Sequence, residues 1–551
     1  TNGFYLEALD SADLGKDTSG NGNDWINTNV VQVTDTPTDN YATLNPLDNA
    51  LGASITNGNL QVTSSGASWK TVRNTLALTA GSWYAELTST VGIGNGNSFF
   101  GIVPMGVTLP QPVGQGSATS WGYSSNGNIY NNGSVINATG SAWSAGTTVA
   151  LTFDGSTLKF YNAGVLVATI SSIPEDTYAV GVSFYDNNSG EFNFGQKPFT
   201  YTPPTGFKAL STQNLPDATV VPSESFGAVT YTGNGSTQSI TGLDFGPDFT
   251  WIKVRNSASY EQMWFDSVRG ATKYVRSNST AAESTVADTL TSFDSNGFSL
   301  GANGDVNGSD FPIVAWNWKA GTEVTNNDGT LEAQVSANPE AGFSIATYVG
   351  NGVSGATFGH GLGVAPELVM VKDLDTAFNW VVYSKPVGNT KTLYLNLTAP
   401  ETSVATWANT TPTASVVSVG VNGLYNNDTT KNHVAYCFTS VEGYSKIGSY
   451  NGNGSTDGPF IYLGFKPAFI MIKYTVAGVS NWMMYDSKRN TSNVVNDYLV
   501  SNETSAEATK DWLDITANGF KIRNTDNTVS TINYTTGGDR TFIYMAFAEQ
   551  P

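Results

Sequence analysis

Short apolar runs alternate with clusters of Gly, Asn, Asp and Ser along almost the whole chain. Three examples are TVALTF at 148–153, LKFY at 158–161 and FIMIK at 469–473. Runs of this kind, rich in β-branched and aromatic residues and bounded by turn residues, are typical of antiparallel strands. Helical periodicity is weak and allows at most a short helix at 281–287 and another at 505–512. The pattern therefore predicts an all-β protein.

The stretch 151–170, LTFDGSTLKFYNAGVLVATI, shows this alternation most clearly. An Asp-Gly pair and an Asn-Ala-Gly triplet separate its three apolar runs. Asp-Gly pairs and short Gly-containing loops favour hairpins, so the stretch predicts a β-meander. The strands of residues 1–207 fit one larger β-sandwich.

A repeat of roughly 100 residues organises the rest of the chain, and such a period indicates one folding unit that is copied along the sequence. Each copy begins with a similar motif: YTGNGS at Tyr231, YVGNGV at Tyr348 and YNGNGS at Tyr450. Each copy then has a Pro followed by an apolar run that ends in Lys, in the order GPDFTWIK, APELVMVK and KPAFIMIK. The glycines and asparagines of the opening words supply the positive φ of a turn, so we interpret these words as turns.

Further sequence motifs recur at equivalent positions in each copy. The aromatic-rich run occurs as MWFDS (263–267), NWVVYS (379–384) and NWMMYDS (481–487). Trp380 and Trp482 share one repeat position, and we predict that both lie in a core. The predicted organisation is a sandwich at 1–207, a linker at 208–226, β-modules at 227–321, 343–440 and 441–551, and a second linker at 322–342. The three modules are expected to follow one another in series.

Composition narrows the range of partners. Charged residues make up 13% of the chain, the formal net charge is −20, and no cluster of Lys or Arg occurs. Nucleic-acid binding needs a basic surface that displaces counterions, so we predict no nucleic-acid partner. No apolar stretch reaches the roughly 18 residues of a membrane-spanning helix, so no membrane insertion is expected. Cys437 is the single cysteine, which excludes an internal disulfide.

Several motifs in residues 1–207 resemble the SPRY family. WYAE at Trp83–Glu86 is similar to the family's WYxE motif, and NFGQKPF at Asn193–Phe199 is similar to its NFGQxPF motif. The resemblance implies a concanavalin-like jelly roll whose loops bind partners. The words LGKDTSGNGNDW (14–25) and TPTDNYATLNPL (36–47) are similar to phrases in bacteriophage tail proteins.

The repeats also resemble modules of bacteriophage tail proteins. The matching words include VSANPEAGFSI (335–345), GHGLGVAPELVMVK (359–372) and the stretch 441–473. The resemblance implies a virion tail fibre or receptor-binding protein that adheres to polysaccharide or lipopolysaccharide of the host cell surface. It also implies a homotrimer that contacts other virion tail proteins. These modules have no agreed catalytic or binding residues, so none is carried over.

Residues suited to nucleophilic or acid–base catalysis are few. His360 and His433 are the only histidines, and we expect structural roles for both. His433 and Cys437 are four positions apart, which on a strand separates them by about 13 Å, too far for nucleophile activation. No enzyme activity, catalytic residue or cofactor is predicted.

A pair of carboxylates could serve glycoside hydrolysis. One acid recurs within the dense repeat motifs: Asp266 matches Asp486, but Ser384 fills the middle copy. We interpret an acid that is exchangeable for serine as turn chemistry. The oxygen-rich loops 17–24 and 524–528 lack EF-hand spacing, so Asx-turns are favoured over Ca²⁺ and no metal site is predicted.

Aromatic residues carry the predicted binding function, because sugar rings stack on exposed Trp and Tyr side chains. Trp121, Tyr123 and Tyr130 crowd the turn-rich segment WGYSSNGNIY and are the candidate ligand-binding residues. The alternative is that Trp121 lies in the core and the two tyrosines lie at its rim.

Two other functions stay open beside adhesion. One is a purely structural virion component that spaces other parts of the capsid or tail. The other is a glycan-degrading tailspike, although such spikes are built on a parallel β-helix with short, regular rungs, and the repeat of roughly 100 residues argues against that architecture.

Overall fold

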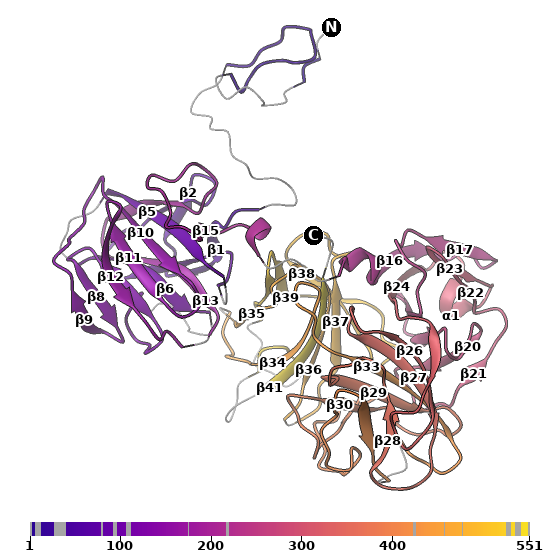
Figure 1. Cartoon of the computed structure of the whole chain (residues 1–551). Helices are drawn as coiled ribbons and strands as arrows, with labels where there is room; N and C mark the ends of the chain where they lie inside the picture. Colours follow the sequence, from indigo (N-terminus) through magenta and orange to yellow (C-terminus); the bar gives the residue numbers. More distant parts are fainter. Residues whose placement is uncertain are drawn as a thin grey trace. The chain divides into compact units, whose positions relative to one another are not determined.

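The computed structural model describes residues 3–5, 13–26, 40–78, 81–91, 96–105, 112–174, 176–215, 220–421, 426–456, 458–476, 478–524, 531–534 and 541–548. The chain divides into two compact units, Thr1–Leu215 and Pro216–Pro551. Strands make up nearly all the regular structure of the described residues, whose one α-helix is the four-residue α1 (Gly304–Asn307). No helix in this part of the chain is long and apolar enough to cross a membrane. The predicted all-β fold with several sandwiches is confirmed (Figure 1).

The first unit is a sandwich of two β-sheets. One sheet has the order β1 (Leu44–Ala50), β4 (Lys70–Asn74), β13 (Tyr178–Phe184), β6 (Ser98–Pro104), β7 (Trp121–Ser124), β8 (Asn128–Asn131), β9 (Ser134–Ala138). The other has the order β12 (Val165–Ile170), β11 (Leu158–Asn162), β10 (Thr148–Phe153), β5 (Trp83–Val91), β14 (Ser189–Asn193), β3 (Gln61–Thr63), β2 (Ser54–Thr56), with β15 (Lys208–Ala209) parallel to β5. Leu87 of β5 and Phe100 of β6 belong to the core between the sheets. Because β10, β11 and β12 pair in succession, the predicted meander is confirmed.

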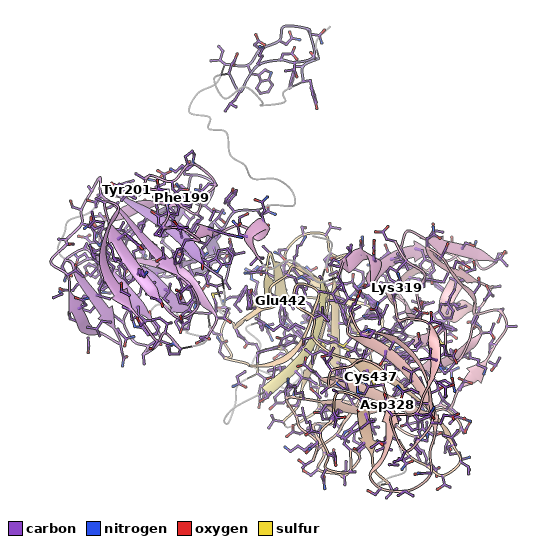
Figure 2. All side chains as sticks on the ribbon, viewed as in Figure 1. Phe199, Tyr201, Lys319, Asp328, Cys437 and Glu442 are labelled. Atoms are coloured by element: carbon purple, nitrogen blue, oxygen red, sulfur yellow. The ribbon has the colours of Figure 1, made fainter. Side chains whose placement is uncertain are left out.

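The two motifs that resemble SPRY domains meet on the outer face of β5. Glu86 is 1% exposed, and its carboxylate accepts hydrogen bonds from the backbone N–H groups of Thr200 and Tyr201, both at 2.9 Å. The ring of Tyr84 packs edge-on against Phe199 at 4.8 Å, and Phe199 and Tyr201 lie close together on this unit (Figure 2). Burying a carboxylate requires such donors. The motifs therefore fasten the segment after β14 onto the sheet.

The second unit contains the three repeats, named repeat 1 (227–321), repeat 2 (343–440) and repeat 3 (441–551). The main sheet of repeat 1 has the order β16 (Phe226–Thr232), β24 (Pro312–Trp318), β18 (Phe249–Val254), β19 (Met263–Asp266), β20 (Lys273–Arg276), β21 (Ser284–Thr285), and a smaller sheet holds β17 (Gln238–Thr241), β23 (Gly297–Leu300), β22 (Leu290–Asp294). The main sheet of repeat 2 has the order β25 (Glu323–Asn326), β26 (Ala333–Asn338), β27 (Phe343–Val349), β33 (Asn432–Phe438), β29 (Leu368–Asp373), β30 (Val381–Ser384), β31 (Leu393–Tyr394). A separate two-stranded sheet holds β28 (Ala356–Gly359) and β32 (Val416–Val419). Repeat 3 forms one sheet in the order β34 (Ser445–Asn451), β41 (Thr541–Ala548), β36 (Pro467–Tyr474), β37 (Trp482–Asp486), β38 (Val495–Val500), β39 (Ala508–Thr516), β40 (Gly519–Ile522), β35 (Phe460–Tyr462).

Some segments differ from the sequence-based expectation. Residues 322–342, expected as a linker, hold β25 and β26, and Ala333 and Val335 of β26 are buried in the sheet of repeat 2. The stretches 281–287 and 505–512, which allowed short helices, contain β21 and the start of β39. In each case pairing with a neighbouring strand overrides a weak local preference.

The expected linker 208–226 contains β15 and two 3₁₀ turns, η1 (Thr212–Asn214) and η2 (Pro222–Glu224). The boundary between the two compact units falls within it.

The central strands of each repeat are buried on both faces. In β18, Ile252 and Val254 belong to the core of repeat 1, together with Met263 of β19. Phe249 and Trp251 of the same strand belong to a second core. A strand that is covered on both sides is apolar along its whole length. This double burial explains why the runs that end in Lys show no polar alternation.

The second core is shared by all three repeats. Trp318, Phe438 and Phe547 occupy one repeat position, next to β18, β29 and β36 respectively. Their ring centroids form a triangle with sides of 6.3, 6.0 and 5.5 Å. The repeats therefore close into a ring about this triangle, in which each repeat contacts both others, and their strands converge in Figure 1. We name the three contacts seam 1/2, seam 2/3 and seam 3/1 after the repeats that they join.

Candidate functional site

The three aromatic residues predicted to bind a ligand lie on β7 and β8. Trp121 is 7% exposed, and its ring packs against Tyr178 in the core of the sandwich. Tyr123 is fully buried, and its hydroxyl group donates to the carbonyl of Ser141. Neither ring has a free face on which a sugar could stack, so the structure places Trp121 and Tyr123 in the core and not at a ligand site. Tyr130 is half-buried, and its ligand role stays a prediction.

The histidines and the cysteine are enclosed in repeat 2. His360 is fully buried, with its Nε2 atom 3.1 Å from the carbonyl oxygen of Thr413. His433 is also fully buried, and its ring stacks on Tyr348 with centroids 5.1 Å apart. Burial raises the pKa of the Cys437 thiol to about 12, which disfavours the thiolate form that a nucleophile needs. These contacts agree with the structural roles predicted for the histidines.

The loop 17–24 uses its carboxylate to hold its own backbone. Asp17 Oδ1 accepts hydrogen bonds from the N–H groups of Ser19 at 2.8 Å and Tyr5 at 2.9 Å, and Oδ2 accepts one from Asn23 at 2.9 Å. Hydrogen bonds to Ser19 and to these N–H groups lower the pKa of Asp17. Contacts of this kind define an Asx-turn, the interpretation that the sequence favoured.

The second oxygen-rich loop, 524–528, lies outside the described residues except for Asn524. Among the residues that the structure describes, no group of three or more His, Cys, Asp or Glu side chains is placed to hold a metal ion.

A cyclic set of hydrogen bonds ties the three repeats together. Each donor side chain reaches the backbone carbonyl of an equivalent position in the neighbouring repeat: Gln262 to Val500, Trp380 to Arg276, and Trp482 to Tyr394. The two indole bonds are 2.8 and 3.0 Å long. Trp380 and Trp482 are 0% and 1% exposed, so the prediction that both lie in a core is confirmed.

The lysine that ends each apolar run is buried near the seams. Lys253, Lys372 and Lys473 are fully buried. Lys253 Nζ donates to the carbonyl of Thr504 in repeat 3 at 2.7 Å, and Lys473 Nζ donates to the carbonyl of Thr398 in repeat 2 at 3.1 Å. Lys372 Nζ bonds to carbonyls of its own repeat. Burial lowers the pKa of Lys253 and Lys372 to about 8 and that of Lys473 to about 7.

Because these lysines are buried, we expect the free energy of unfolding to rise with pH between about 7 and 9.5. Their pKa values are lower in the folded state than the ordinary 10.5, so the unfolded state binds more protons in this window. Lys473→Met should reduce the slope of the unfolding free energy by up to about 1.4 kcal/mol per pH unit. Urea unfolding at several pH values measures the slope, and equal slopes for the variant and the native chain would show that folded Lys473 stays charged.

Asp486 is buried at seam 3/1 and joins two repeats. Its Oδ2 atom accepts hydrogen bonds from Arg489 Nε at 2.6 Å and from the indole Nε1 of Trp316, in repeat 1, at 3.0 Å. Its Oδ1 atom accepts the backbone N–H of Arg489 at 2.8 Å, which closes a turn. The interpretation of this acid as turn chemistry is therefore incomplete, because the carboxylate also fixes the neighbouring repeat.

Asp266 makes the equivalent contacts at seam 1/2. It accepts hydrogen bonds from Arg269 Nε at 2.5 Å and from the hydroxyl group of Tyr436, in repeat 2, at 2.6 Å. The middle repeat has Ser384 at the acid position and Val387 at the arginine position. Both members of the ion pair are thus replaced together, so neither charge is left buried without its partner.

Seam 3/1 also contains a pocket of about 90 Å³. Its lining residues from repeat 1 and the turn before it are Ser223, Phe226, Gly227, Ala228, Gly242, Leu243 and Asp244, and those from repeat 3 are Ala468, Ser487, Lys488 and Ala548. Ser487 is 7% exposed, and its hydroxyl group has no hydrogen-bond partner among the described residues. Buried hydroxyl groups are ordinarily bonded. The lining thus combines an unpartnered hydroxyl group with the charged residues Asp244 and Lys488.

The pocket lies at a repeat position where the third copy lacks an acid. Three pairs of residues are equivalent in the repeats: Asp248–Ser267, Glu367–Lys385 and Ala468–Ser487. In each pair the backbone N–H of the second residue donates to the carbonyl of the first. In repeats 1 and 2 the side chains are also joined, by bonds of 2.8 Å each. Alanine in repeat 3 leaves an empty volume and an unpartnered hydroxyl.

Sequence reasoning missed this pocket, although a signal was present. The three runs GPDFTWIK, APELVMVK and KPAFIMIK carry Asp, Glu and then Ala after the proline. Loss of an acid from one copy indicates a site only when the neighbouring repeat is known to cover that position.

The fold and the seams define a two-unit all-β protein whose second unit is a closed ring of three repeats. The model of a family described as a domain of unknown function, DUF7483, matches residues 221–551, which is more than half of the chain. The chain belongs to this family. No curated protein matches it.

Solved structures similar to this chain match about a quarter of its length. The SPRY domain of human HERC1 is 18% identical, covers 28% of this chain and 99% of its own, and has a TM-score of 0.26. The TRIM65 PSpry domain is 15% identical, covers 28% and 92%, and has a TM-score of 0.24. The carbohydrate-binding module CBM66 from Bacillus subtilis is 13% identical, covers 28% and 90%, and has a TM-score of 0.20.

Proposed function

We propose that the chain is a bacteriophage adhesion protein, a tail fibre or receptor-binding protein that binds polysaccharide or lipopolysaccharide of the host cell surface. The observation that carries the proposal is the pocket in seam 3/1, with the unpartnered hydroxyl group of Ser487. The virion location rests on the resemblance of the repeats to tail-protein modules.

The pocket chemistry suits a sugar ring. Sugar hydroxyl groups donate and accept hydrogen bonds, while the C–H groups of the ring are apolar. Asp244 is an acceptor, Lys488 is a donor, and the hydroxyl groups of Ser223 and Ser487 are both. Leu243 and the small side chains of the lining supply the apolar surface. A site of this size binds weakly by itself, so adhesion would depend on several copies acting together, as in the expected homotrimer.

A binding assay with the full chain tests the adhesion function. The fluorescently labelled protein is applied to a panel of bacterial isolates and to an array of their purified polysaccharides and lipopolysaccharides. We expect it to bind a subset of the isolates and to lose binding after mild periodate treatment, which cleaves vicinal diols of sugars. Binding that periodate leaves unchanged, or no binding to any isolate or glycan, would contradict glycan adhesion.

A structural virion component is the second candidate, and the closed ring favours it. Three repeats held by hydrogen bonds across every seam make a rigid body that could space other virion proteins. If the labelled protein binds no isolate and no glycan, the structural role becomes the better supported of the two functions. Release of reducing ends from a bound polysaccharide would instead indicate a tailspike enzyme, and the expectation of no enzyme activity stays a prediction.

A further inference from the structure

Repeats 1 and 2 show what normally fills the place of the pocket. The Asp248 carboxylate accepts hydrogen bonds from the hydroxyl group of Ser267 and from the backbone N–H of Ala320, both at 2.8 Å. The Glu367 carboxylate accepts one from the ammonium group of Lys385 at 2.8 Å. Each carboxylate is therefore held by the side chain of its paired repeat position. In repeat 3 the donor is present and the carboxylate is absent.

Repeat 3 keeps the donor and adds a cation. Ser487 stands in the place of Ser267, with its hydroxyl group unpartnered. The next residue, Lys488, replaces the uncharged Val268 and Pro386 of the other repeats. Its side chain is exposed and lines the pocket, and among the described residues its ammonium group has no ion pair. A hydroxyl donor and an ammonium group at a vacated carboxylate position favour a carboxylate supplied by a ligand, since charge-assisted hydrogen bonds are about twice as strong as neutral ones.

The other lining residues limit what can carry that carboxylate. Asp244, which comes from repeat 1, would repel a simple anion but accepts hydrogen bonds from hydroxyl groups. A volume of about 90 Å³ corresponds to roughly six water-sized groups. The pocket thus has room for a carboxylate and the adjoining part of one hydroxylated ring.

We propose that the pocket in seam 3/1 binds a uronic acid residue of a surface glycan. Ser487 and Lys488 donate hydrogen bonds to the sugar carboxylate, and Asp244 accepts hydrogen bonds from ring hydroxyl groups. The inference rests on the proposed function and names the class of sugar that the site takes.

Titration of the full chain with matched monosaccharides tests whether the pocket recognises the carboxylate group of the sugar. The methyl glycosides of glucuronic and galacturonic acid are compared with those of glucose and galactose, which carry CH₂OH in place of the carboxylate. We expect at least one acidic sugar to bind ten times more tightly than its neutral partner, by calorimetry and by saturation-transfer NMR. Equal affinities for the acidic and neutral partners, or no binding of either acidic sugar, would overturn the proposal.

Substitutions in the pocket test whether the acidic sugar binds there. Ala468→Asp restores the acid found in repeats 1 and 2, so its own carboxylate should occupy Ser487 and Lys488 and weaken uronate binding at least tenfold. Lys488→Gln changes an exposed side chain and should weaken binding about fivefold, even if Ala468→Asp fails to fold. Lys385→Gln, at the filled position of repeat 2, is the matched control and should leave binding unchanged. Native affinity in both pocket variants would show that the uronate binds elsewhere, against the proposal.

The assay on bacterial isolates separates the two proposals. If Ala468→Asp loses uronate binding but still adheres to cells, the pocket is real and adhesion uses another surface. If the native chain adheres to cells but binds no acidic sugar, the uronate inference fails and the adhesion function stands. If the chain binds the acidic sugar but no isolate or glycan, adhesion fails while the pocket chemistry is correct.

Discussion

Replacing Asp486 with Ser should lower the free energy of unfolding of the second unit by about 3 kcal/mol, the lower end of the cost of breaking a buried ion pair, because Glu507 still pairs with Arg489 at 2.8 Å. The guanidinium of Arg489, whose side chain is fully buried, loses the partner of its Nε atom and keeps Glu507 at Nη1. The indole N–H of Trp316 in the neighbouring repeat loses its acceptor as well. Denaturant unfolding of the full chain, followed by near-ultraviolet circular dichroism, measures the loss.

The double variant Asp486→Ser with Arg489→Val should recover most of this stability. It copies Ser384 and Val387 of the middle repeat and removes both charges together. A buried ion pair replaced by uncharged residues is often nearly neutral in stability, in contrast to a pair that is broken. Glu332→Ser, which removes an exposed acid, is the control and should change stability by no more than about 0.5 kcal/mol. A double variant as unstable as the single one would contradict the explanation.

Local pattern was sufficient to predict the strands and the repeat. Residues 151–170 form the predicted meander because their turn residues permit little else. Trp380 and Trp482 are core residues, as their shared repeat position indicated. The closed ring was not predicted, because the same runs are compatible with modules in series. Its signal lay in the absence of polar alternation in β18, β29 and β36, which requires a partner on each face.

The candidate site was harder to predict because it depends on contacts between distant residues. Trp121 and Tyr123 lie in a turn-rich segment, yet alternation along β7 does not reveal that both faces of the strand are covered. The pocket, in turn, depends on Ala468 being next to repeat 1, more than 200 positions earlier in the chain. Comparison of the three copies identifies the missing acid, but only the ring shows that its absence creates a cavity.

Replacing Trp318 with Ala should destabilise all three repeats at once. Its indole is fully buried, and its ring contacts Phe438 of repeat 2 and Phe547 of repeat 3. Loss of a buried tryptophan costs about 3–5 kcal/mol, since the cavity closes only in part. Because the cavity lies in the shared core, the second unit should still unfold in one transition, with its midpoint lowered as a whole. Calorimetry of the full chain measures the midpoint and the number of transitions.

Trp143→Ala is the matched control for Trp318→Ala. Trp143 is 2% exposed and lies in the core of the first unit, so its replacement should lower only the transition of that unit. Modules that fold independently would behave differently: Trp318→Ala would split the transition of the second unit and shift only one part of it. In a closed ring every central strand has one face against the shared core, and a repeat that lost its neighbours would expose that face to water. The number of transitions therefore distinguishes a ring that folds as one body from three modules in series.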